Sequence, residues 1–236
     1  MTHKPIKEEG KSVLPRVILH NEVSVDGRID GFTPNIALFY ELASGWKEDA
    51  TLAGCDTLLK AMEAEHVENK ALKVYKSTKK DPKDSRPLLI VPDSSGRLKN
   101  WDYWRKQPYW RDGIALCSRA TPNSHLDYLQ EQQISTIIAG DDHVDLKKAL
   151  EELYGQYAIK VIRVDSGGTL NGALLRAGLV DEISLLLNPC LAGSVNSNFL
   201  FKALDLTESE GAIQLMLTHM EKLKDDIVWL SYETLY

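Results

Sequence analysis

The sequence predicts an α/β protein with a mostly parallel central sheet, helices on both faces and a C-terminal antiparallel hairpin. Short apolar runs suited to buried strands alternate along the chain with segments whose apolar residues recur at helical spacing. With 236 residues the chain is long enough to bury one α/β core. Its last two long segments, 215–223 and 227–236, are joined only by Lys224-Asp225-Asp226, which is typical of a hairpin.

The elements follow in order from this periodicity. The predicted strands before the hairpin are 17–25, 51–54, 88–91, 114–117, 136–139, 161–165 and 182–189. The predicted helices are 36–46, 56–64, 124–133, 145–154 and 170–177. Asn35 is the expected cap of the first helix, and Gly178 is expected to end the last. Because no repeat or linker interrupts the pattern, we expect a polar tail over residues 1–12 and a single domain over 13–236.

Composition narrows the class of protein. A hydrophobic share of 43% and a charged share of 26% are ordinary for a globular chain. The net charge of −6 argues against nucleic acid or an anionic membrane as the main partner. Cys55, Cys117 and Cys190 are too few and too widely spaced for a disulfide framework. With neither a signal peptide nor a membrane-spanning run, we expect a cytoplasmic protein with a small-molecule substrate.

Adjacent glycines stand between a predicted strand and a predicted helix in "VDSGGTL", residues 164–170. A bare turn there exposes backbone N–H groups at the positive end of a helix dipole, which favours phosphate. We therefore expect Gly168 to combine a positive φ with space for a phosphate group. The alternative is structural, because such glycines also let a helix and a sheet approach closely. The run matches neither the dinucleotide fingerprint nor a P-loop.

Other candidate sites are weaker. The pattern H-x-E occurs at His20–Glu22 and His66–Glu68, but no C-x-x-C pair follows at Cys190, so no zinc site is expected. The aromatic and basic stretch 101–112 could stack a nucleobase, although a connecting loop pinned by its aromatics is favoured. The lysine-rich segment 69–87 is interpreted as a solvated loop. Without a nucleophile elbow, hydride transfer from a bound cofactor fits better than hydrolysis.

Five blocks in order carry a resemblance to a known family. They are "NEVSVDGRIDG" (21–31), "LAGCDTLL" (52–59), "VPDSSGRL" (91–98), "AGDDHVDLKKALEEL" (139–153) and "VDSGGTLNGALLRAGLVDEISLLLNPCLAG" (164–193). The chain resembles the reductase domain of riboflavin biosynthesis, the pyrimidine reductases related in fold to dihydrofolate reductase. The resemblance covers nearly all of residues 17–236 and implies a dihydrofolate-reductase-like fold.

The resemblance also implies a cofactor and site residues. The cofactor would be NADPH, bound by Val23, Thr57, Ser94, Gly140, Ser166, Gly167, Gly168, Thr169 and Leu170. The catalytic, substrate-side residues would be Asp165, Ser24 and Asp26. For Asp165 there is an alternative, a side chain that caps the following helix. No metal is implied.

Three departures from the family pattern bear on the substrate. Ala61 stands where an aspartate contacts the cofactor, Asp165 replaces a glutamate, and Ser166 replaces the first glycine of a triplet. The resemblance implies a stand-alone NADPH-dependent reductase of a ribosylaminopyrimidine 5′-phosphate. The alternatives are a dihydrofolate-reductase-like enzyme acting on a pterin and a nucleotide-binding protein without catalysis. A homodimer paired through residues 215–236 is expected, and Lys60 or the lysine-rich loop would read the cofactor 2′-phosphate.

Overall fold

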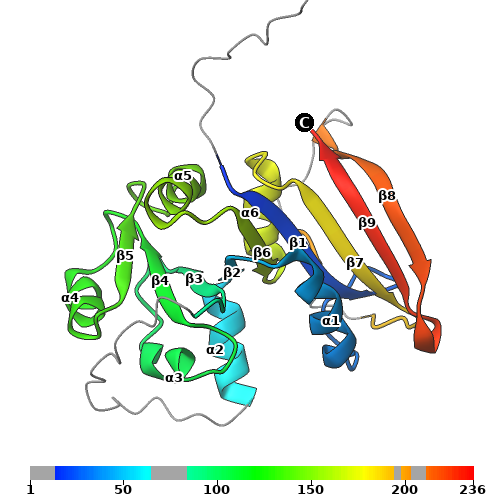
Figure 1. The fold of residues 1–236 in the computed structure, drawn as a ribbon, viewed down its shortest axis with the longest axis horizontal. Helices are drawn as coiled ribbons and strands as arrows, with labels where there is room; N and C mark the ends of the chain where they lie inside the picture. The colour runs from blue at the N-terminus through cyan, green and yellow to red at the C-terminus, as the bar shows by residue number, and fades with distance from the viewer. Residues whose placement is uncertain (1–13, 65–83, 194–197, 203–210) are drawn as a thin grey trace, which may run out of the picture.

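The computed structural model describes residues 14–64, 84–193, 198–202 and 211–236. Its described residues form one sheet of nine strands, drawn in Figure 1. The strands are β1 (Arg16–Ser24), β2 (Ala50–Ala53), β3 (Leu88–Pro92), β4 (Asp112–Cys117), β5 (Ser135–Ile138), β6 (Val161–Asp165), β7 (Glu182–Asn188), β8 (Gln214–Lys222) and β9 (Val228–Leu235). Each predicted strand is present; β6 has the predicted bounds, and no end of the others is shifted by more than two residues.

The order of the strands is β5-β4-β3-β2-β6-β1-β7-β9-β8. The strands from β5 to β7 pair in parallel, whereas β9 runs antiparallel to both β7 and β8. Figure 1 shows α4 and α5 beside β5 at one end of the sheet and the β9–β8 hairpin at the other. The mostly parallel sheet and the antiparallel C-terminal hairpin were both predicted.

The helices connect the parallel strands. They are α1 (Ile36–Ala43), α2 (Cys55–Ala64), α3 (Trp101–Arg105), α4 (Asn123–Glu131), α5 (Leu146–Tyr157) and α6 (Gly168–Arg176), with single 3₁₀ turns at Ser44–Trp46 and Lys224–Asp226. The side chain of Asn35 caps α1 by accepting a hydrogen bond from the backbone N–H of Leu38 at 3.2 Å, as expected. The described segments between these elements are loops.

The sheet is covered on both faces, as predicted. One core cluster joins Leu19, Leu52 and Ile90 to α5 and α6 through Leu150 and Leu174. A second cluster packs alternate strand residues against α2, α3 and α4; its members include Leu58, Leu89, Val91, Trp101, Cys117 and Leu129. Successive residues of a strand point to opposite faces, so β3 contributes Leu89 to one cluster and Ile90 to the other. Helices α2 and α6 therefore lie on opposite faces.

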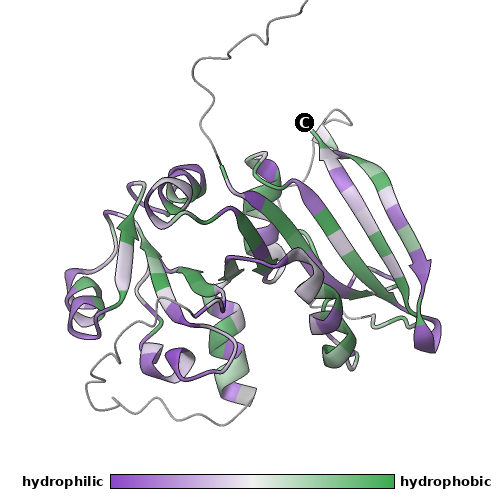
Figure 2. Cartoon of the chain, viewed as in Figure 1, coloured by the Kyte–Doolittle hydropathy of each residue, from purple (hydrophilic) through white to green (hydrophobic). Residues whose placement is uncertain are grey.

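The C-terminal hairpin differs from the rest of the sheet in its exposure. Leu215, Met216, Leu217 and Met220 of β8 are each between 41% and 69% exposed. Figure 2 shows hydrophobic and hydrophilic bands alternating along β8 and β9. The outer strand therefore presents apolar side chains to solvent at the edge of the sheet.

One structural expectation was wrong. The aromatic stretch 101–112 is not simply a connecting loop, because it begins with α3 and its first tryptophan is fully buried. Trp101 packs against Gly113, where an added Cβ would meet the indole ring at 2.4 Å, so this tryptophan cannot stack a ligand. The tail over residues 1–12 and nearly all of the lysine-rich segment fall outside the described residues. Among those that are described, no helix is long and apolar enough to cross a membrane.

The strand order places a ligand site at one position. From β2 the chain proceeds through β3 and β4 to β5, toward one edge of the sheet; from β6 it crosses β1 to reach β7. Strands β2 and β6 are neighbours, with Ala53 opposite Asp165 at their carboxyl ends. In open α/β sheets, ligands bind in the crevice where the direction of winding reverses. The crevice beyond Ala53 and Asp165 is that position here.

Candidate functional site

A cavity of about 880 Å³ lies at these strand ends. That size is within the usual range for small-molecule sites, roughly 300–1,000 Å³. The loop after β2 lines it through Gly54 to Thr57, and the loop after β6 lines it through Asp165 to Leu170. It therefore includes eight of the residues that the resemblance implied: Thr57, Ser94, Asp165, Ser166, Gly167, Gly168, Thr169 and Leu170.

The N-terminus of α6 opens into this cavity. Gly167 is its N-cap and has no side chain with which to cap the first turn. The amide of Asn171 holds the turn from behind, donating to the backbone oxygens of Ser166 at 3.3 Å and Leu200 at 3.0 Å and to the side-chain oxygen of Asn21 at 3.1 Å. The side chain of Asn21 also donates to the Ser166 oxygen, at 3.0 Å. This arrangement fixes the turn and leaves the first N–H groups of α6 facing the cavity.

The two glycines of the turn have different roles. A Cβ at Gly168 would lie 2.2 Å from the backbone oxygen of Phe199, and the Gly168 oxygen accepts the N–H of Lys202 at 2.9 Å. Gly168 does not have a positive φ, so the prediction of a positive φ at this glycine was wrong. Its bare backbone lets the segment 199–202 lie against α6. A Cβ at Gly167, in contrast, would meet only the side chain of Ile29, at 3.5 Å, within the cavity lining.

A second helix N-terminus faces the first across the crevice. The Gly54 oxygen accepts the N–H groups of Thr57 at 3.0 Å and Leu58 at 3.2 Å as α2 begins. A Cβ on Gly54 would lie 2.5 Å from the hydroxyl oxygen of Ser166, so the two loops are in close contact. Burial, together with the charge of Asp93, raises the pKa of the Cys55 thiol to about 12. Cys55 is therefore a neutral thiol in the cavity wall.

The loop after β3 completes this side of the cavity. The hydroxyl oxygen of Ser94 accepts the N–H of Val144 at 3.0 Å, which joins this loop to the segment that precedes α5. Gly140 does not line the cavity. Its φ is +87° and a Cβ there would lie 2.2 Å from the His143 oxygen, so it forms the tight turn that presents His143 and Val144 to the cavity.

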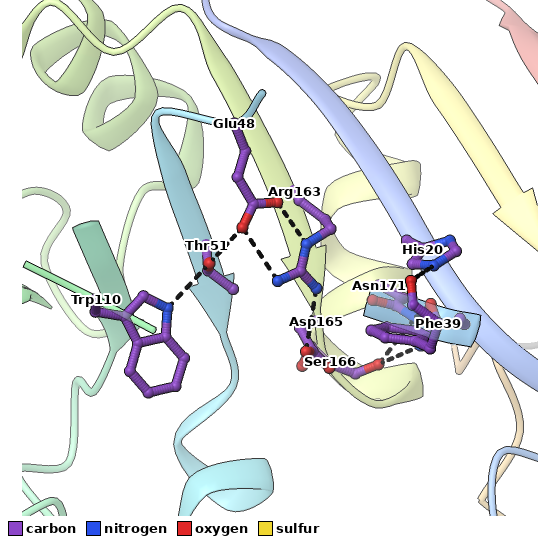
Figure 3. Close-up of polar contacts among 10 residues, drawn as sticks. His20, Phe39, Glu48, Thr51, Trp110, Arg163, Asp165, Ser166 and Asn171 are labelled. Carbon is purple, nitrogen blue, oxygen red and sulfur yellow. Dashed lines mark hydrogen bonds and ion pairs between the residues drawn. The ribbon is translucent and has the colours of Figure 1, made fainter. Parts of the chain in front are cut away.

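Asp165 is held by a buried arginine. Figure 3 shows Arg163 of β6 between Asp165 and Glu48, with its Nη1 3.1 Å from Asp165 Oδ2 and its Nη2 3.1 Å from Glu48 Oε1. Thr51 donates to Glu48 at 2.8 Å, and Trp110 donates to Thr51 at 3.0 Å. The Arg163 side chain is 4% exposed and that of Asp165 is 32% exposed. The capping alternative for Asp165 is wrong, because α6 has no side-chain cap.

Aromatic groups from α1 line the cavity beside this ion pair. Burial, together with the charge of Asp165, raises the pKa of the Tyr40 hydroxyl to about 12, so Tyr40 remains protonated at neutral pH. Burial lowers the pKa of His20 to about 4, although the hydrogen bond to the Phe39 oxygen opposes this. His20 is therefore neutral, and it contacts Ser184 at 3.0 Å and the Phe39 oxygen at 3.1 Å.

Ser24 and Asp26 are turned away from the cavity lining. Ser24 is fully buried and donates to Asp26 at 2.6 Å, and Asp26 accepts the N–H groups of Ala192 at 3.0 Å and Gly193 at 2.9 Å. The hydrogen bond from Ser24 and then those two N–H groups lower the pKa of Asp26. Val23 is buried on β1 and also does not line the cavity. Ser24 and Asp26 support a turn whose Ile29 and Asp30 do line the cavity.

Glu22 was not singled out as a ligand residue on the basis of the sequence, apart from its place in an H-x-E pattern. It is 7% exposed and lines the cavity. The backbone N–H of Asn35 donates to its Oε1 at 2.8 Å, and Asn188 donates to the same atom at 3.1 Å. His20 contacts a different set of groups, and no cluster of potential metal ligands occurs among the described residues.

Basic side chains line the cavity mainly on the α2 side. Lys60 follows the first turn of α2, and Arg97 pairs with Asp56 at 2.7 Å. Lys202 lies on the segment that packs against α6. Ala61, which stands in place of an aspartate, packs against the core and does not line the cavity.

Fold and cavity together define an α/β protein with a cavity at the carboxyl ends of β2 and β6, next to the N-termini of α2 and α6. The family model of the RibD C-terminal domain matches residues 15–229. The chain belongs to this family.

The relatives agree with this assignment. The chain is 31% identical over 191 residues to the 2,5-diamino-6-ribosylamino-4(3H)-pyrimidinone 5′-phosphate reductase of Aquifex aeolicus, covering 77% of the chain and 80% of that protein. RibD of Acinetobacter baumannii superposes with a TM-score of 0.66 at 20% identity, over 94% of the chain and 58% of RibD. A Thermotoga maritima deaminase and 5-amino-6-(5-phosphoribosylamino)uracil reductase gives 0.60 at 15% identity, over 94% of the chain and 57% of that protein. The chain thus spans just over half of these two longer proteins, whose likeness confirms the fold.

Proposed function

We propose that the protein is an NADPH-dependent reductase of a ribosylaminopyrimidine 5′-phosphate. The family is one of pyrimidine 5′-phosphate reductases that use a nicotinamide cofactor, which makes this chain an oxidoreductase. The observation that carries the proposal is the pair of helix N-termini at the β2–β6 crevice. They would bind the phosphates of the cofactor through backbone N–H groups, which in α6 no side chain of the described residues caps.

The residues present fit a dinucleotide phosphate. Gly167 to Leu170 supply backbone N–H groups, and Thr57 and Ser94 supply hydroxyls on the facing loops. Lys60 lines the cavity and would supply positive charge to a 2′-phosphate, whereas Arg97 already pairs with Asp56. When bound, NADPH supplies the hydride. The neutral Cys55 thiol and the protonated Tyr40 hydroxyl add no negative charge of their own to the cavity wall.

The substrate would lie on the β1–α1 side, next to Asp165. Arg163 holds one carboxylate oxygen of Asp165, so the other is available to ribosyl hydroxyls. The contacts of Ser24 and Asp26 favour a role in holding the turn that carries Ile29 and Asp30. We include these two residues in the site as supports of its wall.

We also propose that two copies of the chain form a homodimer through the β9–β8 hairpin. Among the described strands β8 pairs only with β9, and an outer strand with exposed Leu215, Leu217 and Met220 is a surface that globular proteins normally cover. Light scattering should give about twice the chain mass of 26.5 kDa. A monomer at micromolar concentration would refute the dimer without affecting the proposed chemistry.

The direct test of function is a turnover assay. Purified protein is mixed with NADPH and, in separate reactions, with the diaminopyrimidinone and the aminouracil ribosyl 5′-phosphates, while the nicotinamide absorbance is followed. Oxidation that requires a pyrimidine supports the proposal. Oxidation with a dihydropterin alone would make the chain a pterin reductase, and binding without turnover would make it a nucleotide-binding protein.

A further inference from the structure

The carboxylate of Glu22 has one oxygen that is fully used and one that is not. Oε1 accepts two hydrogen bonds, from the Asn35 N–H and the Asn188 amide. Oε2 is buried, and the described residues offer it no hydrogen-bond partner. An unsatisfied buried carboxylate oxygen is costly, so proteins seldom retain one without a use. Because Glu22 lines the cavity, a ligand there can provide the donor that Oε2 lacks.

The orientation of this side chain is fixed by its neighbours. Asn35 begins α1 and Asn188 ends β7, the strand that pairs with β1. Two donors from separate elements hold Oε1 in place. Rotation of the carboxylate would break both hydrogen bonds, so Oε2 stays the atom that meets the ligand.

The surroundings of Glu22 indicate the chemistry of that ligand. Asp30 and Asp165 line the cavity on the loops after β1 and β6, whereas on the α2 side Lys60 and Arg97 are accompanied by Asp56 and Glu63. A phosphate is favoured at the N-terminus of α6, and a neutral group bearing N–H donors is favoured at Glu22, where the other carboxylates also attract donors. An amino-substituted pyrimidine ring has such donors.

We propose that Glu22 selects the pyrimidine by accepting a hydrogen bond from its 2-amino group. This inference rests on the proposed function. A 2,5-diaminopyrimidinone carries an N–H donor at C2, where an aminouracil carries a carbonyl oxygen. A carbonyl facing Oε2 would leave the carboxylate unsatisfied and place two acceptors in contact, so the protein prefers the diaminopyrimidinone.

Replacement of Glu22 by glutamine should shift the substrate preference from the diaminopyrimidinone toward the aminouracil. The two donors at Oε1 require an acceptor, so the amide oxygen occupies that position and the NH₂ group occupies the position of Oε2. The variant thus presents a donor to C2, which suits the carbonyl of the aminouracil. The ratio of kcat/KM for diaminopyrimidinone to that for aminouracil should fall by about 10- to 100-fold in Glu22→Gln, the scale of one charge-assisted hydrogen bond.

The experiment measures this ratio with NADPH in the parent, in Glu22→Gln and in Glu182→Gln. Glu182 is also a carboxylate of the central sheet and is 9% exposed, but it pairs with Arg16 and lies outside the cavity. A ratio of two kcat/KM values is independent of the fraction of active enzyme, so a loss of stability does not imitate the effect. Glu182→Gln should keep the parent ratio.

The outcomes separate this inference from the proposed function. A parent that prefers the aminouracil, or a Glu22→Gln variant that keeps the parent ratio, overturns the role of Glu22 even if turnover is observed. If the parent turns over neither compound, the proposed function fails. Calorimetry with the same two pyrimidine phosphates then still tests the role of Glu22. Preferential binding of the diaminopyrimidinone, reversed in Glu22→Gln, supports the role of Glu22, whereas equal binding or none overturns it.

Discussion

The loops that follow β1 and β6 lie side by side, and both contain residues that the sequence placed in the site. The β1 loop is closed on itself, because Ser24 donates to Asp26 and Asp26 accepts two backbone N–H groups. The β6 loop is open: Asp165 is held from one side by Arg163, and the first turn of α6 has no side-chain cap. Polar residues in a strand-end loop identify a binding site only where the loop leaves their groups available to a ligand.

The largest expected effect is that of Asp165→Asn. The asparagine oxygen can still accept from Arg163, but the charge that orients ribosyl hydroxyls is lost. Turnover should fall by about 10²-fold with NADPH affinity little changed, as for removal of one well-placed polar group. Steady-state kinetics on a verified substrate and calorimetry with NADPH measure the two quantities. Full turnover would mean that the open β6 loop does not act through this carboxylate.

Gly167→Val and Gly168→Val should fail in different ways. At Gly167 the new side chain enters the cavity beside the α6 N-terminus, and NADPH affinity should drop by about 10- to 100-fold while the fold is kept. At Gly168 it collides with the Phe199 backbone, which should cost about 1–3 kcal/mol of stability. Calorimetry and thermal unfolding of both variants check this. A Gly167→Val variant that binds NADPH like the parent would contradict the proposal that the N-terminus of α6 binds the cofactor.

Lys60→Gln tests whether the ammonium group of Lys60 binds the 2′-phosphate of the cofactor. The preference for NADPH over NADH should fall by about 10-fold, because one charge-assisted contact with that phosphate is removed. Lys148→Gln is the matched control, since Lys148 is exposed on α5, pairs with Asp145 and lies outside the cavity. Calorimetric titration of both cofactors gives the ratio. An unchanged ratio in Lys60→Gln would move recognition to another residue.

The smallest effect is expected in the closed loop. Ser24→Ala should cost about 1 kcal/mol of stability and reduce turnover far less than Asp165→Asn does. Because the pKa of Asp26 is lowered in the folded protein, its contribution is fully present above its unfolded pKa of about 4 and is lost as the pH falls. Thermal unfolding across acidic pH should show a weaker pH dependence in Ser24→Ala. A turnover loss as large as that of Asp165→Asn would place Ser24 at the substrate.

The sheet and its helices were predictable because buried strands and amphipathic helices require apolar residues at regular spacing, and a single exception rarely hides that spacing. What the sequence could not reveal depends on contacts between distant segments. Gly168 is bare because residues 199–202 lie against it, some thirty positions away. Arg163 and Glu48 pair only because β2 and β6 are neighbours, and the carboxylate of Glu22 depends on Asn188. Trp101 is buried because Gly113 makes room for it.

Part of the site was predictable because the motif blocks lie at strand ends that the parallel sheet brings together. Thr57 and Ser166 to Leu170 all line one cavity. Ser24, Asp26 and Gly140 belong to the same blocks but form the surrounding turns, and Val23 is buried in β1. Residue type and order do not determine which side of a loop faces a cavity. The hydrogen bonds that each group already makes do determine it.

Titration of the ¹⁵N-labelled protein with NADPH, followed through its backbone amide signals, tests the central claim most directly. Binding at the open loop predicts the largest shifts for Gly167 to Leu170, with further shifts at Thr57 across the crevice. The amides of Ala192 and Gly193, which donate to Asp26, should move little. The largest shifts at those two amides, or on β8, with α6 unaffected, would contradict the account.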